Sequence, residues 1–399
     1  MTRPFEPDAP APEGFVPLCV PEIRGNEWRY VRECLDTNWV SSVGAFVDRF
    51  ERTVADYVGI RHAVATVNGT AALHIALLVA GVRPEDEVLV STLTFVAPTN
   101  AIRYVGAWPV FMDAEPNHWQ IDPQKVKDFL AQECEWRNGE LRDKATFRRV
   151  RAILPVHILG HPVDMDPILE MARQYGLIVI EDATESLGAK YLNRPVGHLG
   201  DIACFSFNGN KIITTGGGGM IVTDNEAWAH RTRYLTTQAK DDPVEFVHGE
   251  IGYNYRLTNI QAAMGVAQVE KLDEYLAAKR RIASCYTAAL HDIPGLRPQA
   301  TAGWAASSYW LYTVLVDPER YGRNSRELMA YLETRQIQTR PLWRPNHRLP
   351  PYEKCRAYHV TVADQLHSQA LSLPSSVGLT DEQFERVVKA LADGHGGRV

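Results

Sequence analysis

The most informative stretch of the chain runs from Asp201 to Gly219 and reads DIACFSFNGNKIITTGGGG. Its first part, Ile202–Phe207, is mostly apolar, as expected of a strand that is covered on both faces. Lys211 follows shortly after this strand, within a flexible Asn-Gly-Asn-Lys turn. Such a lysine can reach into a crevice of the fold, although a surface lysine in a glycine-rich hairpin shows the same pattern. The glycine run comes after Lys211, which reverses the order found in a nucleotide-binding P-loop.

Six further runs of the same kind surround this stretch. They are short, rich in β-branched or aromatic residues, and separated by turns or helical segments: Ala63–Val67, Glu87–Val90, Trp108–Met112, Ala152–Val156, Leu177–Ile180 and Met220–Val222. Helical spacing follows several of them, as in Thr70–Ala80 and Pro167–Tyr175. This alternation predicts an α/β fold with an open, mostly parallel sheet and helices on both of its faces.

Changes of pattern along the chain predict two domains. Residues 1–17 are rich in proline and are expected to form a flexible tail. Residues 18–270 are expected to form the large domain. Residues 271–399 are expected to form a smaller C-terminal α/β domain, whose glycine-rich end, from Gly394, is expected to fray.

Three segments indicate the smaller domain and the helical stretch that leads into it. A long helical stretch runs from Gln261 to about Leu290, Trp310–Val316 has the composition of a strand, and Ser325–Arg335 has that of a helix. Within the large domain, the charged segment Gln132–Arg149 interrupts the strand rhythm and is expected to be a solvated surface insertion.

Composition narrows the classes of function. The 399 residues include 42 Lys and Arg against 48 Asp and Glu, a net charge of −6. No general positive field draws such a protein to nucleic acid or to an acidic membrane. Its six cysteines (Cys19, Cys34, Cys134, Cys204, Cys285 and Cys355) are scattered without metal-ligand spacing, and no metal site is expected. With neither a signal core nor an apolar run of about 18 residues, we expect a cytoplasmic protein.

Two other strand ends carry candidate functional groups. In Val67–Ala72, a strand leads through Gly69 into a helix start at Thr70, which offers free N–H groups to a phosphate. A simple helix cap has the same sequence pattern. In Leu177–Asp182, a buried strand ends in two carboxylates at the edge where parallel sheets bind ligands. Asp182 could instead cap the next helix or bind Mg²⁺, but the chain contains no P-loop to accompany a magnesium acid.

Together these strand ends match the needs of one cofactor. Pyridoxal phosphate requires a helix start for its phosphate, a carboxylate that keeps its ring nitrogen protonated, and a lysine that binds its aldehyde. Gly69 with Thr70, Asp182 and Lys211 supply these three groups in one predicted sheet. The pattern therefore predicts a pyridoxal phosphate enzyme.

The residues also resemble a known family, the nucleotide-sugar aminotransferases of the DegT/StrS type, which are pyridoxal phosphate enzymes of fold type I. The resemblance is carried by four segments and by Leu371–Pro374 near the end of the chain; the four are Asn68–Leu73, Glu181–Gly188, Phe205–Gly219 and Gly252–Arg256. It runs from about residue 17 to residue 392. It implies a large cofactor-binding domain with a smaller C-terminal domain.

Residue by residue, the resemblance implies a set of cofactor contacts. Lys211 matches the lysine that binds the cofactor covalently, and Asp182 matches the partner of the ring nitrogen. Gly69, Thr70 and Ser206 match the phosphate contacts.

Further implied contacts surround these. Phe95 falls where an aromatic ring covers the cofactor, although an ordinary core phenylalanine is the alternative. Glu185 stands near the cofactor hydroxyl, where the family usually has Gln or His, and an ionised carboxylate cannot donate a hydrogen bond there. Asn254 matches a residue that reaches the phosphate from the neighbouring subunit, which implies a homodimer with shared active sites. Asn208 and Gly217 replace the His and Glu of many relatives.

Substrate contacts are implied more broadly. Trp39 and Ser41 lie in the N-terminal segment 18–44, which borders the site in the family. His157 follows a predicted strand and is expected to face the crevice, although a strand-end histidine is often structural. Arg256 matches a residue near the anionic substrate, and Arg340 and His347 lie in a small-domain loop that could line a sugar-nucleotide site.

The reaction implied by the resemblance moves an amino group from glutamate to the 4-keto group of a nucleotide-linked 4-keto-6-deoxy sugar. Residues 25–28, 39–42 and 208–211 look most like the branch that aminates UDP-linked N-acetylhexosamines. Enzymes for GDP- or dTDP-linked sugars, the perosamine type among them, share the cofactor residues and are the alternative. A related dehydratase would carry histidine in place of Lys211. A non-catalytic regulatory protein on this fold is disfavoured by the complete set of Lys211, Asp182 and Ser206.

Overall fold

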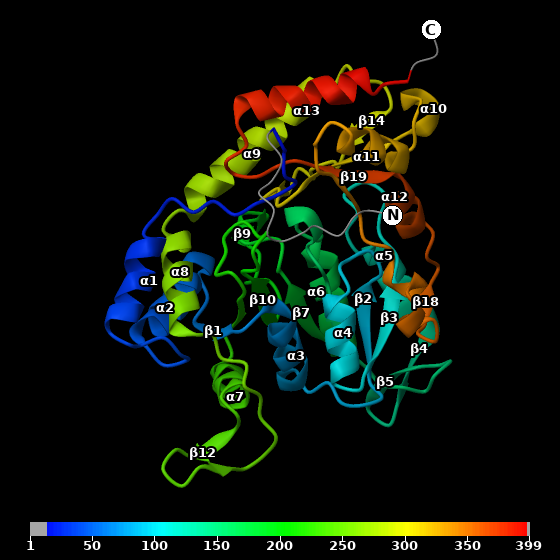
Figure 1. Cartoon of the computed structure of the whole chain (residues 1–399). Helices are drawn as coiled ribbons and strands as arrows, with labels where there is room; N and C mark the ends of the chain where they lie inside the picture. The colour runs from blue at the N-terminus through cyan, green and yellow to red at the C-terminus, as the bar shows by residue number, and fades with distance from the viewer. Residues whose placement is uncertain (1–13, 397–399) are drawn as a thin grey trace.

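The computed structural model describes residues 14–396, which form a large domain and a smaller one stacked upon it (Figure 1). The large domain is built on an eight-stranded sheet. In spatial order its strands are β1 (His62–Thr66), β11 (Gly219–Thr223), β10 (Ile202–Ser206), β7 (Ile178–Asp182), β6 (Val150–Leu154), β2 (Glu87–Ser91), β3 (Trp108–Met112) and β18 (Ala357–Tyr358). All seven predicted strands are therefore confirmed.

Only β11 runs against its neighbours in this sheet, and the other strands are parallel. The carboxyl ends of β1, β7 and β10 consequently meet at one edge. Helices cover the sheet: α3 (Gly69–Val79), α4 (Ala97–Tyr104), α5 (Pro123–Asp128), α6 (Met165–Tyr175) and α7 (Glu226–Thr236). The predicted α/β class with a mostly parallel sheet is confirmed.

Three further helices pack together beside β1. They are α1 (Glu27–Asp36), α2 (Ala45–Val58) and α8 (Asn259–Val269), seen at the left of Figure 1. The predicted long helical stretch is two helices. The first ends at Val269, and Glu270 and Lys271 form a turn before α9 (Leu272–Ala289) begins. Helix α9 runs up into the smaller domain (Figure 1).

The smaller domain has its own antiparallel sheet, in the order β14 (Leu296–Pro298), β16 (Tyr312–Val316), β19 (Ala370–Leu373) and β17 (Arg340–Pro341). A separate apolar core lies between this sheet and the helices α9, α11 (Ser325–Glu333) and α13 (Asp381–Asp393). The short helix α10 (Pro318–Tyr321) completes this region.

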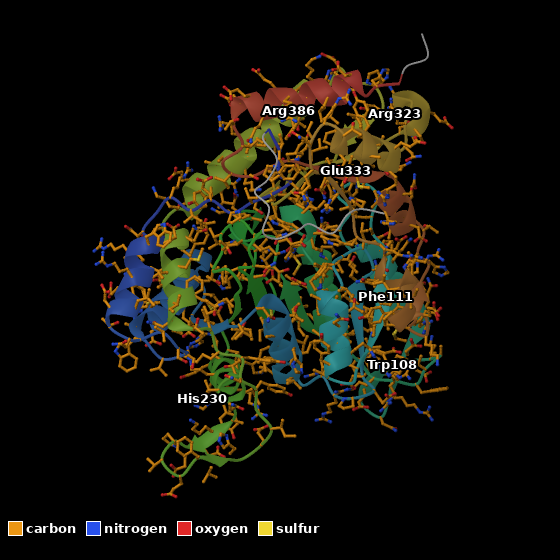
Figure 2. The ribbon with its side chains drawn as sticks, viewed as in Figure 1. Trp108, Phe111, His230, Arg323, Glu333 and Arg386 are labelled. Atoms are coloured by element: carbon orange, nitrogen blue, oxygen red, sulfur yellow. The ribbon has the colours of Figure 1, made fainter. Side chains whose placement is uncertain are left out.

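The sequence boundaries of the two domains need two corrections. Val16, in the predicted flexible tail, is fully buried and pairs with Ile337 of the smaller domain. Arg386 of α13, labelled in Figure 2, holds the same segment by donating to the Gly14 carbonyl. Residues 1–13 and 397–399 lie outside the described part of the chain, so the rest of the tail and the last residues remain predictions.

The second correction concerns the end of the chain. Residues of the predicted C-terminal domain return to the large sheet, where β18 pairs with β3 and places Ala357 beside Phe111, labelled in Figure 2. Helix α12 (Val362–Gln369) follows, and its first N–H groups donate to the buried carboxylate of Asp113. The C-terminal segment therefore belongs to both domains.

The predicted surface insertion is a hairpin, β4 (Cys134–Arg137) and β5 (Glu140–Asp143), and is not simply solvated. Its Asp143 is fully buried and forms an ion pair with Arg356, which also pairs with Glu133. A small three-stranded sheet lies elsewhere in the chain, in which β8 (Lys190–Tyr191) lies between β9 (Arg194–Pro195) and β15 (Ala305–Ala306).

The last hairpin, β12 (Lys240–Asp242) with β13 (Val247–His248), projects beyond α7, the helix that carries His230 (Figures 1 and 2). We call residues 240–251 the arm. Across residues 14–396, no helix combines the length and the apolar character that crossing a membrane requires.

Candidate active site

A cavity of about 370 Å³ opens at the edge of the sheet where β1, β7 and β10 end. Gly69 and Thr70 line it from the start of α3, Ser206 from the end of β10, and Lys211 from the turn beyond. Trp310 lines it from the smaller domain. The structure thus brings the predicted lysine and the predicted phosphate contacts into one cavity between the two domains.

The start of α3 has the shape of an anion cradle. Asn68 caps the helix by accepting the N–H of Ala71 at 2.8 Å, while the first helical N–H groups lack partners within the helix. A Cβ atom added at Gly69 would lie 2.9 Å from Cβ of Ser206 and 3.2 Å from Cγ2 of Thr184. Glycine therefore lets the helix start approach β10 closely, and a phosphate fits the donors gathered there.

Asp182 ends β7 and is only 2% exposed. It does not itself line the cavity, but Thr184 and Glu185, which follow it closely in the chain, do. Its Oδ1 accepts the N–H of Thr184 at 3.1 Å. Burial raises the pKa of the Asp182 carboxyl, and the Thr184 hydrogen bonds and the charge of Lys211 oppose this rise. A buried carboxylate with so few partners fits a protonated ring nitrogen, which would supply the missing positive charge.

Lys211 is held between an acid and an aromatic ring. Its Nζ lies 3.7 Å from Oε1 of Glu185 and 3.9 Å from the centre of the Trp310 ring. Its backbone N–H donates to the Asn208 carbonyl at 3.0 Å, which closes the turn after β10. The side chain is 14% exposed, so the amine is largely shielded from water.

Glu185 is the acid beside Lys211, and it stands where the family that the sequence resembles usually has Gln or His. Its Oε2 accepts the N–H of Leu159 at 2.8 Å, and the residue is 5% exposed. Burial raises the pKa of Glu185 to about 7, although the nearby charge of Lys211 acts to lower it. Because a carboxyl with this pKa exists in both forms near neutral pH, it can donate a hydrogen bond when protonated.

The expectation for His157 is wrong. Its ring is fully buried, with Nε2 3.0 Å from Oε2 of Glu181, and Nδ1 accepts the N–H of Val163 at 2.9 Å. Both ring nitrogens are thus used inside the protein. Glu181, on the neighbouring strand, is also satisfied by N–H groups of Gly197 and Leu199. His157 is a structural residue and does not line the cavity that contains Lys211.

Two other predicted substrate residues do not line the cavity. Nδ1 of His347 lies 2.8 Å from Oγ1 of Thr92, and its Nε2 lies 3.7 Å from Oδ2 of Asp364. Arg340 is exposed on β17 and donates only to the neighbouring Thr339 carbonyl among the described contacts. Phe95, in contrast, does line the cavity and is 53% exposed.

Most of the remaining predicted site residues line a second and larger cavity, of about 1070 Å³. Trp39, Asn254 and Arg256 line it together with residues of the arm. Arg256 donates to the Ser42 carbonyl at 3.1 Å and lies 3.7 Å from Asp48. Ser41 lies beside this group, where its carbonyl accepts the N–H of Asn259. Within one chain, none of these residues lines the cavity that contains Lys211.

Trp310 was not predicted as a site residue. Its indole Nε1 donates to the Asn210 carbonyl at 2.6 Å, and its ring stacks 6.4 Å from that of Trp343. In the sequence, Trp310 begins an apolar strand and resembles a core residue. Its contacts with Asn210 and Lys211 distinguish it, and these contacts join residues about a hundred positions apart in the chain.

Comparison with known proteins agrees with this site. The model of the DegT/DnrJ/EryC1/StrS aminotransferase family matches residues 21–392. The GDP-perosamine synthase of Caulobacter vibrioides is 40% identical over 377 residues, covering 94% of this chain and 97% of that protein. The GDP-perosamine synthase of Escherichia coli O157:H7 is 37% identical, covering 94% and 98%.

A solved structure of DesI, in the presence of its TDP-sugar product, is 29% identical with a TM-score of 0.86 and covers 98% of this chain and 95% of that one. The chain belongs to the DegT/DnrJ/EryC1/StrS aminotransferase family. It is an enzyme with pyridoxal phosphate as cofactor, and it acts as an aminotransferase on nucleotide-linked sugars. The predicted fold type, cofactor and enzyme class are confirmed.

Proposed function

We propose that the enzyme transfers an amino group from glutamate to the 4-keto group of a GDP-linked 4-keto-6-deoxy sugar. Three of the similar proteins are GDP-perosamine synthases, with 34–40% identity. This supports the alternative predicted from the sequence better than the UDP-linked N-acetylhexosamine that was first expected. The observation that carries the chemistry is the placement of Lys211 beside Glu185 and next to the helix start at Gly69, with the buried Asp182 at the end of the adjoining strand β7.

The chain offers a holder for each part of the cofactor. The Gly69 and Thr70 helix start and Ser206 would hold the phosphate, Asp182 the ring nitrogen, and Lys211 the aldehyde carbon. When bound, pyridoxal phosphate supplies an electron-withdrawing ring that stabilises negative charge on the carbon next to the transferred nitrogen. Asp182 would keep a proton on the ring nitrogen through a charge-assisted hydrogen bond.

Lys211 Nζ would take the proton from the carbon of the amino donor that carries the nitrogen, and would later return a proton to the sugar carbon. It must act as a free amine, and its shielded position keeps bulk water from competing for that proton. Trp310 packs against it and limits the directions in which the long side chain can swing. Glu185 faces the same nitrogen, and because burial raises the pKa of its carboxyl to about 7, this carboxyl can accept or donate a hydrogen bond there.

The two cavities are explained if the active enzyme is a homodimer. The arm exposes apolar side chains, with Val244 77%, Phe246 67% and Ile251 84% exposed. Such a patch on a projecting hairpin favours contact with another protein surface. We infer that a second copy of the chain covers the arm and the larger cavity, so that Asn254 and Arg256 of one subunit complete the site of the other.

Mixed dimers test this arrangement. Lys211→Ala and Asn254→Ala each damage a different half of a shared site, so a heterodimer of the two has one intact site. Mixing the two inactive variants under exchange conditions is expected to restore part of the activity. If both homodimers lose activity and the confirmed heterodimer restores none, the sites are not shared.

A panel of nucleotide sugars tests the substrate. The protein is incubated with glutamate and GDP-, dTDP- or UDP-linked 4-keto-6-deoxy sugars, and the amino sugar is measured by mass spectrometry. We expect the highest kcat/KM with the GDP-linked sugar and no product from Lys211→Ala. A clear preference for the UDP-linked N-acetylhexosamine would overturn the proposed nucleotide, and formation of a dehydrated sugar without nitrogen would overturn the proposed reaction.

A further inference from the structure

A buried lysine outside the reaction has an unusual set of partners. Lys279 lies on α9 and is only 2% exposed. Its Nζ donates to the carbonyls of Trp310 at 2.8 Å and Ser375 at 2.5 Å. Its third partner is the sulfur of Cys19, at 3.6 Å. Within residues 14–396 no carboxylate lies within 4.0 Å of this amine, so its charge is not balanced by an acid.

Burial without a carboxylate partner favours the neutral form of this amine over the charged one. Burial lowers the pKa of Lys279, while the contact with Cys19 opposes this shift. A neutral amine has a free electron pair and is a nucleophile. The two carbonyl acceptors hold Nζ in place next to the sulfur.

Cys19 is the accessible member of the pair. It is partly exposed, and its thiol donates to the Asn210 carbonyl at 3.4 Å. Of the other cysteines, Cys34, Cys134 and Cys204 are buried, Cys355 is partly exposed and Cys285 is exposed. Among the described hydrogen bonds, Cys19 alone joins a thiol to a lysine amine.

We propose that Cys19 and Lys279 form a redox-sensitive modification site, in which a peroxide links Sγ and Nζ covalently. The peroxide first oxidises the sulfur: its O–O bond breaks, an S–O bond forms, and one water leaves. The Nζ electron pair of Lys279 then attacks the sulfenic acid; the S–N bond forms, the S–O bond breaks, and a second water leaves with a proton from the amine. The chain loses two hydrogen atoms, and a thiol reductant returns them.

The position of this pair gives the linkage an effect on the active site. Asn210 precedes Lys211, and its carbonyl accepts from both the Cys19 thiol and the Trp310 indole. Trp310 in turn covers the Lys211 amine. Linking Sγ to Nζ removes the thiol donor from Asn210 and draws Lys279 from the Trp310 carbonyl. It also ties the N-terminal segment to α9, the helix that enters the smaller domain.

Peptide mapping tests the linkage directly. The holoenzyme is treated with hydrogen peroxide, remaining thiols are blocked, and tryptic peptides are compared with and without a thiol reductant. We expect a cross-linked pair of peptides that contain Cys19 and Lys279, lighter than their sum by two hydrogens, with loss of cleavage after Lys279. The reductant should restore both separate peptides. This readout is on the polypeptide itself and is independent of the proposed substrate.

Two variants make the assignment specific. Cys19→Ser removes the sulfur, and Lys279→Arg keeps a positive charge but not a nucleophilic amine, so both should lose the cross-linked pair. Cys285, an exposed thiol, reports within each sample that the peroxide reached the protein. Oxidation of Cys285 without any linkage at Cys19, or conversion of Cys19 to sulfinic acid with normal cleavage after Lys279, would overturn the proposal.

Discussion

A single methyl group at Gly69 tests how closely the cofactor cradle is built. In Gly69→Ala the new Cβ would lie 2.9 Å from Cβ of Ser206 and 3.3 Å from its hydroxyl oxygen, so the helix start or Ser206 must move. Extra methyl groups in tightly packed sites typically cost about 1–3 kcal/mol. Alanine also favours helix over glycine by up to about 1 kcal/mol, which offsets part of this cost in the stability of the apoenzyme.

The higher helix propensity of alanine does not offset the loss of cofactor binding, because binding requires the original spacing between α3 and β10. A cost of about 1–3 kcal/mol corresponds to roughly 5- to 150-fold weaker binding of pyridoxal phosphate. The assay is titration of the apoenzyme with cofactor, followed by absorbance. Gly217→Ala is the matched control, because its Cβ would meet only the Gln261 side-chain nitrogen, at 3.9 Å. Binding by Gly69→Ala within about twofold of the wild-type protein would refute the reasoning.

Three other variants separate the roles of the site. Lys211→Ala should still bind pyridoxal phosphate but lose the covalent link that borohydride traps, and persistent labelling would assign the chemistry to another lysine. Asp182→Asn should lower kcat by roughly 10²–10³-fold, the usual effect of removing one electrostatic contact to a developing charge, and unchanged kcat would remove Asp182 from the mechanism. Burial raises the pKa of Glu185 to about 7, so the folded protein favours the protonated carboxyl. The resulting contribution to the free energy of unfolding is present at acid pH and is lost as the pH rises through about 7. Glu185→Gln should abolish this loss in the apoenzyme. Between about pH 5 and about pH 9, its free energy of unfolding should rise by about 2 kcal/mol relative to that of the wild-type protein, as measured by denaturant unfolding. Parallel pH profiles of the two proteins would contradict the assignment.

Local patterns were sufficient for the central sheet because its strands are covered on both faces. Ile202–Ser206 and Val150–Leu154 are largely buried, so each shows a nearly continuous apolar run in the sequence. Parallel strands then place the residues after their carboxyl ends at one edge. The sequence alone therefore groups Asp182, Ser206 and Lys211 at one edge of the sheet.

Contacts between distant segments were not visible in the same way. The pairing of Ala357 with Phe111 and of Val16 with Ile337 involves very short strands, which have no periodicity of their own. His157 shows a related limit, since a strand-end histidine looks the same whether it faces a ligand or a buried acid. Its partner Glu181 lies on the adjacent strand, and that pairing is a property of the folded sheet.

The most direct test of the account is to follow the two half-reactions by the colour of the purified enzyme. The wild-type protein should be yellow, lose this colour when glutamate is added, and regain it when the GDP-linked 4-keto-6-deoxy sugar follows, with one amino sugar formed for each site. Lys211→Ala should show neither change. Colour in the wild-type protein that responds to no amino donor would contradict the assignment of Lys211 and its neighbours as the centre of an amino-group transfer.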